Sequence, residues 1–333
     1  MHLEPKKAGW RQATAIQYLR ENSGILIALL VLCVIFTINS PAFLTRVNMI
    51  NVLRQISMNA IVAFGMTLVI LLGGIDLSVG SIIAVSGCSS VILIVNGCPL
   101  WLGVLVGLAV GALFGFITGT IVAMAKLPPF IVTLAMMTIG RGIAYIFTGG
   151  KPTRFDAEAF NQIGNGYVGI IPIPVIIMLV TMVLCSVLLN KTMFGRHVYG
   201  VGGNRQAAKF SGIKIAKVEI AVYTICGLLA AVSGIIMASR LSGAQPTAGD
   251  GQELDAIAAV VLGGTSMSGG VGRIGGTIIG ALIIGVLNNG MNLMHLSYYW
   301  QLVVKGLIIL FAVYVDALKK DKTLERLFKK KRA

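Results

Sequence analysis

Few side chains in this 333-residue sequence could take part in chemistry, and they lie far apart. The three histidines, His2, His197 and His295, belong to different segments, and the five cysteines show no CxxC spacing. Neither set has the spacing of metal ligands or of a nucleophile with its base. The sequence also lacks the GxxxxGK[ST] loop that holds nucleotide phosphates. We therefore predict no catalytic residue, no metal and no cofactor in this chain, so that any ATP and Mg²⁺ would be used by a partner.

A few ionisable side chains lie within or beside apolar runs, most of them near the ends of those runs: Asp76, Arg141, Glu219 and Lys305. A charge at such a position costs less than one at the centre of a bilayer. Asp76 and Ser78 sit at a junction where two apolar runs almost meet. Asp76 either caps a helix end or is a polar group beside a transport path, and the sequence leaves both readings open. For Arg141, reaching toward the membrane interface is the simpler role.

The composition requires membrane-spanning helices to position these residues. Hydrophobic side chains make up 56% of the chain and charged ones 12%, and the mean hydropathy is +0.88. This leaves too little polar surface to cover a water-soluble globule. The formal net charge of +15 lies in loops and tails that flank apolar runs, which argues for orientation in lipid and against nucleic-acid binding. We predict an all-α integral membrane protein.

The apolar runs predict about ten transmembrane helices, some of them interrupted by glycines. The expected spans are residues 24–39, 56–75, 79–95, 101–125, 130–147, 170–189, 218–239, 257–262, 277–287 and 302–315. Short loops rich in Lys and Arg stay in the cytoplasm, and this rule places both termini there. The chain then divides into a cytoplasmic N-terminal segment (1–23), a transmembrane domain (24–315) and a basic cytoplasmic tail (316–333).

Glycines have two separate patterns in the transmembrane domain. Those at 103, 107, 111, 115 and 119 recur every fourth residue, which leaves one face of a helix bare for close packing against another helix. Leu72-Gly-Gly-x-x-x-Ser78 and Leu262-Gly-Gly-x-x-x-Ser268 have the same form, and paired Gly-interrupted spans are typical of broken helices beside a transport path. Both have the same orientation in the expected topology, whereas an inverted repeat requires opposite ones. Either interruption could still line a path.

The longest polar segment between the apolar runs, residues 190–217, contains six Lys or Arg and no Asp or Glu. We expect this loop on the cytoplasmic side. Within it, residues 205–210 can form a short helix that ends at Gly212, because glycine readily adopts the left-handed conformation that closes helix C-termini. A solvated basic loop that only sets the topology is the plainer interpretation of the composition.

The loop sequence Gly203-Asn-Arg-Gln-Ala-Ala-Lys-Phe-Ser-Gly212 resembles the Ala-Ala-x-x-x-Gly coupling motif of ATP-binding-cassette importer permeases. Gln206 stands where many members of that group have an acidic residue. The stretches VILLGGIDLSVGSI, RLSGAQPTAGDGQELDAIAAVVLGGTSMSGG and YYWQLVVKGLIIL resemble the ribose-type sugar permeases of bacterial importers. The similarity runs nearly from end to end.

This resemblance implies a homodimer in the bacterial cytoplasmic (inner) membrane that imports a monosaccharide such as ribose. It implies two partners, an ATP-binding-cassette ATPase on the cytoplasmic side and an extracytoplasmic sugar-binding protein outside. It assigns ATPase coupling to residues of the central loop: Gly203, Asn204, Arg205, Gln206, Ala207, Ala208, Lys209 and Gly212. The main alternative is a secondary transporter or channel without an ATPase, for which we expect more buried ionisable residues. A membrane-embedded enzyme is a third reading.

Three asparagines, Asn288, Asn289 and Asn292, follow the apolar run 277–287 near its expected outer end. An amide donates and accepts hydrogen bonds without carrying a charge, which suits a hydroxyl-rich sugar. Asn288 and Asn292 are four residues apart and share a helix face. We predict that this pair lines the outer mouth of the path, with Asn289, Asp76 and Ser78 as further candidates. For any one amide, capping its helix or bonding to a neighbouring helix is the simpler role.

Overall fold

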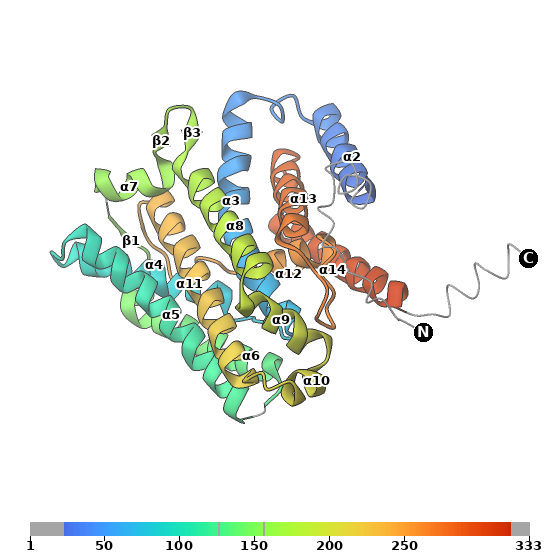
Figure 1. Cartoon of the computed structure of the whole chain (residues 1–333). Helices are drawn as coiled ribbons and strands as arrows, with labels where there is room; N and C mark the ends of the chain where they lie inside the picture. The colour runs from blue at the N-terminus through green and yellow to red at the C-terminus, as the bar shows by residue number, and fades with distance from the viewer. Residues whose placement is uncertain (1–22, 126, 156, 321–333) are drawn as a thin grey trace, which may run out of the picture.

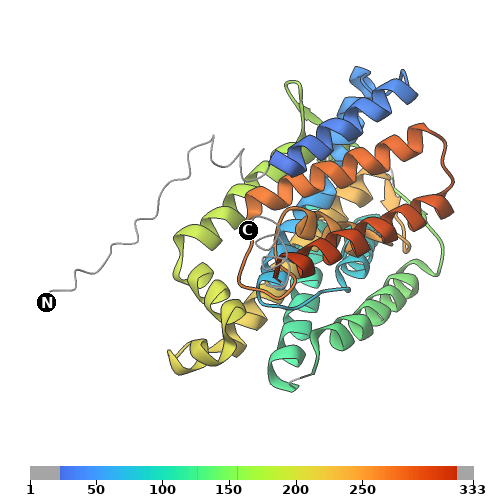
Figure 2. The ribbon, with the colours of Figure 1, turned by 90° about the vertical axis from the view of Figure 1, so that its right-hand side faces the viewer.

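The computed structural model describes residues 23–125, 127–155 and 157–320, so the expected N-terminal segment and most of the basic tail lie outside the described residues. The described part is a bundle of helices (Figures 1 and 2). Within these described residues, seven helices are long and apolar enough to cross a membrane: α3 (Arg46–Leu71), α5 (Leu100–Ala125), α6 (Pro129–Thr148), α8 (Ile173–Lys191), α11 (Ile215–Arg240), α13 (Ile274–Leu293) and α14 (Tyr298–Lys320). The prediction of an all-α membrane protein is confirmed.

Shorter helices occupy the remaining expected spans. Two of them, α2 (Ser23–Asn39) and α4 (Val79–Val95), are apolar, and the third is α12 (Gln252–Leu262), whose first turn carries Glu253 and Asp255. Each expected span thus falls on a helix, while ten crossings and the cytoplasmic side of the termini stay predictions. The large apolar side chains of α5, α6, α8 and α14 that face outward are exposed, Trp101, Ile146 and Phe311 among them. Such faces suit contact with lipid.

Small elements lie at the two ends of the bundle. One end holds α7 (Glu158–Asn165) and two antiparallel strand pairs, β1 (Thr153–Arg154) with β4 (Gly243–Ala244) and β2 (Tyr167–Val168) with β3 (Ile171–Pro172). The other end holds α9 (Met193–Gly203) and α10 (Arg205–Phe210). Loops expected on the same side of the membrane therefore gather at the same end of the molecule.

The bounds of α3 and α13 differ from the expected spans 56–75 and 277–287. The helix α3 begins at Arg46, inside the expected polar connector, where the Thr45 hydroxyl accepts the Asn48 N–H at 3.4 Å. It ends at Leu71, because Gly73 turns the chain with φ 80°. The helix α13 extends to Leu293, so the three asparagines lie inside its last turns rather than after it.

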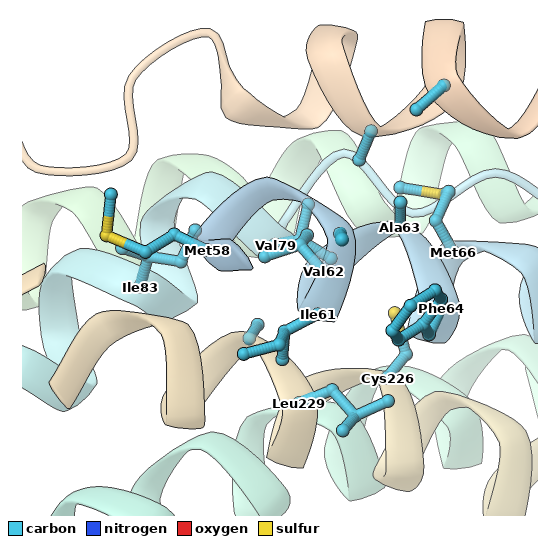
Figure 3. Packing of buried hydrophobic residues seen from close by; sticks show 14 of the residues in the cluster. Met58, Ile61, Val62, Ala63, Phe64, Met66, Val79, Ile83, Cys226 and Leu229 are labelled. Carbon is cyan, nitrogen blue, oxygen red and sulfur yellow. The ribbon is translucent and has the colours of Figure 1, made fainter. Parts of the chain in front are cut away.

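The helix α3 forms the centre of the core. Its residues from Ile56 to Leu71 are buried, and Figure 3 shows Ile61 and Phe64 packed toward Cys226 and Leu229 of α11. A helix that is apolar on all sides is expected to be enclosed by others. The Thr67 hydroxyl bonds to Ala63 O and to the Thr277 hydroxyl, both at 2.7 Å, so this polar group is satisfied within the core.

The bare face of α5 packs against α11 and α4 of the same chain. A methyl group at Gly111 would lie 2.7 Å from the carbonyl oxygen of Gly227, and one at Gly107 would lie 2.9 Å from that of Ser86. A methyl group at Gly115 would overlap the carbonyl oxygen of Tyr223. The every-fourth spacing thus brings helix backbones into contact, which confirms the expected packing of this face.

Candidate coupling and path sites

The short helix α10 carries the residues assigned to coupling. At its start, the Asn204 side-chain oxygen accepts the Ala207 N–H at 2.9 Å. At its end, Gly212 adopts φ 79°, and the N–H groups of Gly212 and Ile213 donate to the carbonyls of Lys209 and Ala208, both at 3.1 Å. This closure requires the left-handed conformation that glycine adopts most easily. The expected helix is confirmed, and its role in coupling stays a prediction.

One side of α10 faces outward. Ala208 is buried, while Arg205, Gln206, Ala207, Lys209 and Phe210 are exposed, Phe210 to 88%. An exposed aromatic side chain among basic and amide groups is a common composition for a docking surface. Phe210 was not among the predicted coupling residues, although an aromatic residue next to Lys209 in a polar loop is itself a sequence signal.

An ion pair connects α10 to α11. The Arg205 guanidinium contacts the Glu219 carboxylate through Nη1–Oε1 at 2.5 Å and Nη2–Oε2 at 3.2 Å. The Glu219 side chain is 6% exposed and that of Arg205 56%. Both residues line a cavity of about 750 Å³ that reaches the turn at Leu127 and Pro128, between α5 and α6. Arg205 was predicted as a coupling residue and Glu219 as a charge near the end of an apolar run, but the contact between them was not predicted.

The two Gly-Gly interruptions close their helices in the same way. Gly73 and Gly264 both adopt positive φ, 80° and 85°, and each donates to a carbonyl in the last turn of its helix. After the first break, Asp76 Oδ1 accepts the backbone N–H of Ser78 at 2.9 Å and its hydroxyl at 2.5 Å. Asp76 and Ser78 are fully buried just before α4. These hydrogen bonds suit the predicted role of Asp76 at a helix end. A role of Asp76 or Ser78 in lining the path stays a prediction.

The asparagines of α13 have different surroundings. Asn288 and Asn289 are buried: Asn288 Nδ2 donates to Asp255 Oδ2 at 2.9 Å, and Asn289 exchanges two hydrogen bonds with Asn48 at 2.8 and 2.9 Å. Asn292 is exposed, and its side-chain oxygen accepts from Gln301 Nε2 at 2.8 Å. Each amide therefore bonds to another residue of the chain, as its simpler predicted role of bonding to a neighbouring helix requires. The path role of the three stays a prediction.

A buried charge pair extends this network to α14. Lys305 Nζ lies 3.0 Å from both carboxylate oxygens of Asp255, and the two side chains are 18% and 11% exposed. Lys305 is one of the ionisable side chains predicted near the ends of apolar runs, and its pairing with Asp255 was not predicted. Because α12 begins at Gln252, Asp255 lies in its first turn and faces the interior.

The candidate residues do not form one site. The coupling residues lie at the end of the bundle with the two Gly-Gly breaks, while Asn288, Asn289 and Asn292 lie toward the opposite end of α13. Among the residues that the structure describes, no group of three or more His, Cys, Asp or Glu side chains is arranged to hold a metal ion. A division between two ends is the arrangement expected of a conduit with one docking surface on each side.

Residues 48–313 match the family described as branched-chain amino acid transport system / permease component. The chain belongs to this permease family. Its members are transport subunits, so the chain is a permease and not an enzyme. No solved structure matched the chain.

Curated relatives of this permease are named for sugars. The chain is 50% identical to the ribose import permease protein RbsC of Bacillus subtilis (strain 168), over 89% of this chain and 92% of the relative. It is 50% identical to the RbsC protein of Escherichia coli (strain K12), over 87% and 92%. The L-arabinose transport system permease protein AraH of the same strain is 39% identical, over 89% and 90%. The resemblance to ribose-type permeases is thereby confirmed.

Proposed function

We propose that this permease is the membrane-spanning subunit of an ATP-driven importer for a monosaccharide, ribose or a close relative. The observation that carries the proposal is the 50% identity, over about nine-tenths of both chains, to relatives named as ribose import permeases. The identity falls to 39% for a relative named for L-arabinose and to 36% for one named for xylose. The family description names branched-chain amino acids, but these relatives favour a sugar.

The assembly consists of two copies of the chain in the bacterial inner membrane, each with ten spans and cytoplasmic termini. An ATPase docks on the cytoplasmic side, and an extracytoplasmic sugar-binding protein docks outside. Support comes from the gathering of the basic loop 190–217 and the two Gly-Gly breaks at one end of the bundle. Loops with positive charge are retained in the cytoplasm, so this end faces inward.

The ATPase contacts α10 and its flanks, from Gly203 to Gly212. The exposed side of that helix, with Phe210 at its centre, supports this assignment. ATP binding and hydrolysis by the partner move α10 and switch the conduit between outward-open and inward-open forms. The ion pair of Arg205 with Glu219 supports a route from α10 into the transmembrane helix α11.

The path itself contains few polar groups, because the external binding protein supplies most of the specificity. Asn288, Asn289 and Asn292 serve its outer part, and Asp76 and Ser78 serve its inner part. Asn292 is the best supported of these, since its amide is exposed. An uncharged amide bonds to sugar hydroxyls without the cost of burying a charge.

A secondary transporter is the second candidate, and the buried pair of Asp255 with Lys305 is the observation that favours it. Ionisable residues inside a membrane often mark ion pathways. Here, however, the two charges neutralise each other, and Asn288 adds a hydrogen bond to the same carboxylate. This arrangement suits a fixed link between three helices better than a group that binds and releases an ion.

Uptake of labelled ribose into vesicles tests the proposal. The chain is reconstituted with the sugar-binding protein, either with or without the co-expressed ATPase subunit. We expect uptake only with the ATPase, and stronger competition by unlabelled ribose than by arabinose or xylose. Uptake that is equally fast without the ATPase would favour the secondary transporter.

A further inference from the structure

Three segments far apart in the sequence meet at the inner end of α3. The N–H of Gly270 donates to the carbonyl oxygen of Leu71 at 2.9 Å, which joins the two Gly-Gly breaks. Gly202, near the end of α9, packs against the same carbonyl, and a methyl group there would overlap the Leu71 oxygen and lie 2.7 Å from the Gly270 nitrogen. We call the contact of Leu71, Gly202 and Gly270 the glycine junction.

Other contacts bind the same segments together. A methyl group on Gly269 would lie 3.0 Å from both the Gly202 oxygen and the Gly73 nitrogen, and one on Gly270 would lie 2.8 Å from the Gly203 Cα atom. The three backbones are therefore at closest approach, and no side chain lies between them. A displacement of one segment cannot be absorbed by a side-chain rotation and must move the others.

A hydrogen bond one turn earlier in α9 reinforces the junction. The Tyr199 hydroxyl donates to the carbonyl oxygen of Gly272 at 2.8 Å. Burial raises the pKa of Tyr199, with Arg273 lowering it in part, so the hydroxyl keeps its proton and remains a donor. The helix α9 thus holds the loop between α12 and α13 at two points.

The junction is also directly connected to the coupling helix. Only Asn204 separates α9 from α10, and its N–H donates to Gly200 O at 3.1 Å while its side chain caps α10. Both helices therefore share one residue as a boundary. A shift of α10 is passed to the end of α9 without a flexible linker.

We propose that Tyr199 and Gly202 are positioning residues that transmit movement of α10 to both helix breaks, residues 72–78 and 263–273. The inference rests on the proposed function and names the route by which the ATPase opens and closes the conduit. One break joins α3 to α4, and the other joins α12 to α13. Moving both breaks together changes the inner end of the path.

The neighbouring glycine of α9 provides a matched control. Gly200 lies two positions before Gly202 on the same helix. A methyl group at Gly200 would contact only Ile213, at 3.6 Å, which is an ordinary contact distance. Gly200→Ala and Gly202→Ala therefore make the same chemical change in the same helix, but only the second enters the junction.

The test measures ribose transported per ATP hydrolysed, in vesicles that contain the chain, its ATPase and the sugar-binding protein. The wild-type complex comes first: if it shows no ATP-dependent ribose uptake, the proposed function itself has failed. With uptake established, we expect Gly202→Ala to bind the ATPase and hydrolyse ATP while its ribose-to-ATP ratio falls by about fivefold or more, the low end of typical coupling between sites. Gly200→Ala should keep the wild-type ratio.

Tyr199→Phe decides the question if Gly202→Ala does not reach the membrane. It removes one hydroxyl from the contact with Gly272, and we expect the ribose-to-ATP ratio to fall while complex assembly is retained. A ratio equal to that of the wild type in Gly202→Ala, or in Tyr199→Phe when the first variant does not fold, would overturn the proposal. So would equal losses of hydrolysis and uptake, which would make the junction a packing contact only.

Discussion

Arg205 and Glu219 are joined through both guanidinium nitrogens and both carboxylate oxygens, at 2.5 and 3.2 Å, although α10 carries one residue and α11 the other. Two parallel contacts fix the relative orientation of the groups as well as their separation. Glu219 is almost completely buried, while Arg205 is half exposed to solvent. Loss of the partner would therefore cost the buried carboxylate more free energy than the solvated guanidinium. The pair therefore fastens α10 to the N-terminal end of α11, a helix that packs along α3, α4 and α5.

Arg205→Gln should leave the Glu219 carboxylate without its partner and weaken the attachment of α10 to α11. We expect ATP-driven ribose uptake to fall by about fivefold or more, as for a typical loss of coupling between sites. The charge-reversed double variant, Arg205→Glu with Glu219→Arg, should recover part of the loss. Arg46→Gln is the matched control, since Arg46 is exposed at the opposite end of α3. Full uptake by Arg205→Gln would show that the pair has no part in coupling.

Gly212→Val should distort the end of α10 through backbone strain alone, because no atom lies within 4 Å of a methyl group placed there. The left-handed conformation at φ 79° costs a residue with a Cβ atom about 1–2 kcal/mol. We expect weaker co-purification of the ATPase with Gly212→Val than with Gly212→Asn, because asparagine tolerates this conformation. Equal recovery of the ATPase with both variants would contradict the docking assignment or the importance of this cap.

Gly111→Leu should disrupt the contact between α5 and α11, where the added atoms would meet Ala231 and the Gly227 carbonyl. Overpacking of this kind costs about 1–3 kcal/mol or more. We expect a lower unfolding temperature in detergent, or loss of the folded protein. Gly142→Leu is the control, because a methyl group at that position of α6 would have no atom within 4 Å. If the two variants unfold at the same temperature, the bare face of α5 is not a tight contact.

Lys305→Met should destabilise the protein, because it leaves the Asp255 carboxylate buried without its cation. Breaking one side of a buried pair costs about 3–5 kcal/mol, whereas replacing both charges by apolar groups is often close to neutral. We therefore expect the double variant Lys305→Met with Asp255→Leu to regain most of the stability, as measured by thermal unfolding, and to transport ribose. A stable double variant that binds the ATPase but transports nothing would assign the pair to the path.

Replacing Asn288 and Asn292 together by leucine should lower ribose uptake while membrane level and ATPase association remain normal. The two residues need separate variants as well, because Asn288 also bonds to Asp255 and its loss can act through stability. Asn292→Leu alone should lower uptake with no change in unfolding temperature. Unchanged uptake by the double variant, or cysteines at these positions that external thiol reagents cannot reach, would remove them from the path.

Local chemistry explains what could be predicted from the sequence. The short helix from Arg205 to Phe210 follows from an asparagine cap and a terminating glycine within a few residues, and the packing face of α5 follows from its own spacing. Helix ends were less accurate, because Thr45 starts α3 within a segment whose polarity suggested a loop. Composition over a window does not register a single capping hydroxyl.

Contacts between distant segments could not be predicted in the same way. Arg205 and Glu219 are 14 residues apart, and Lys305 and Asp255 are 50 apart, on helices whose relative placement no periodicity determines. The glycine junction was equally hidden: Gly202 has the same neighbours in the sequence whether it faces Leu71 or solvent. A helix pattern reveals which faces are apolar or bare, but not which helix lies against each face.

The most direct test of the account is the accumulation of ribose inside vesicles when the proton and sodium gradients have been abolished by ionophores. The vesicles contain the chain, its ATPase and the sugar-binding protein, with ATP on the ATPase side. Because ATP is then the only energy source, we predict that ribose is concentrated above its level on the supply side, and that a non-hydrolysable ATP analogue stops this. Ribose that only equilibrates across the membrane, at the same rate with ATP or the analogue, would contradict the assignment of this permease to an ATP-driven importer.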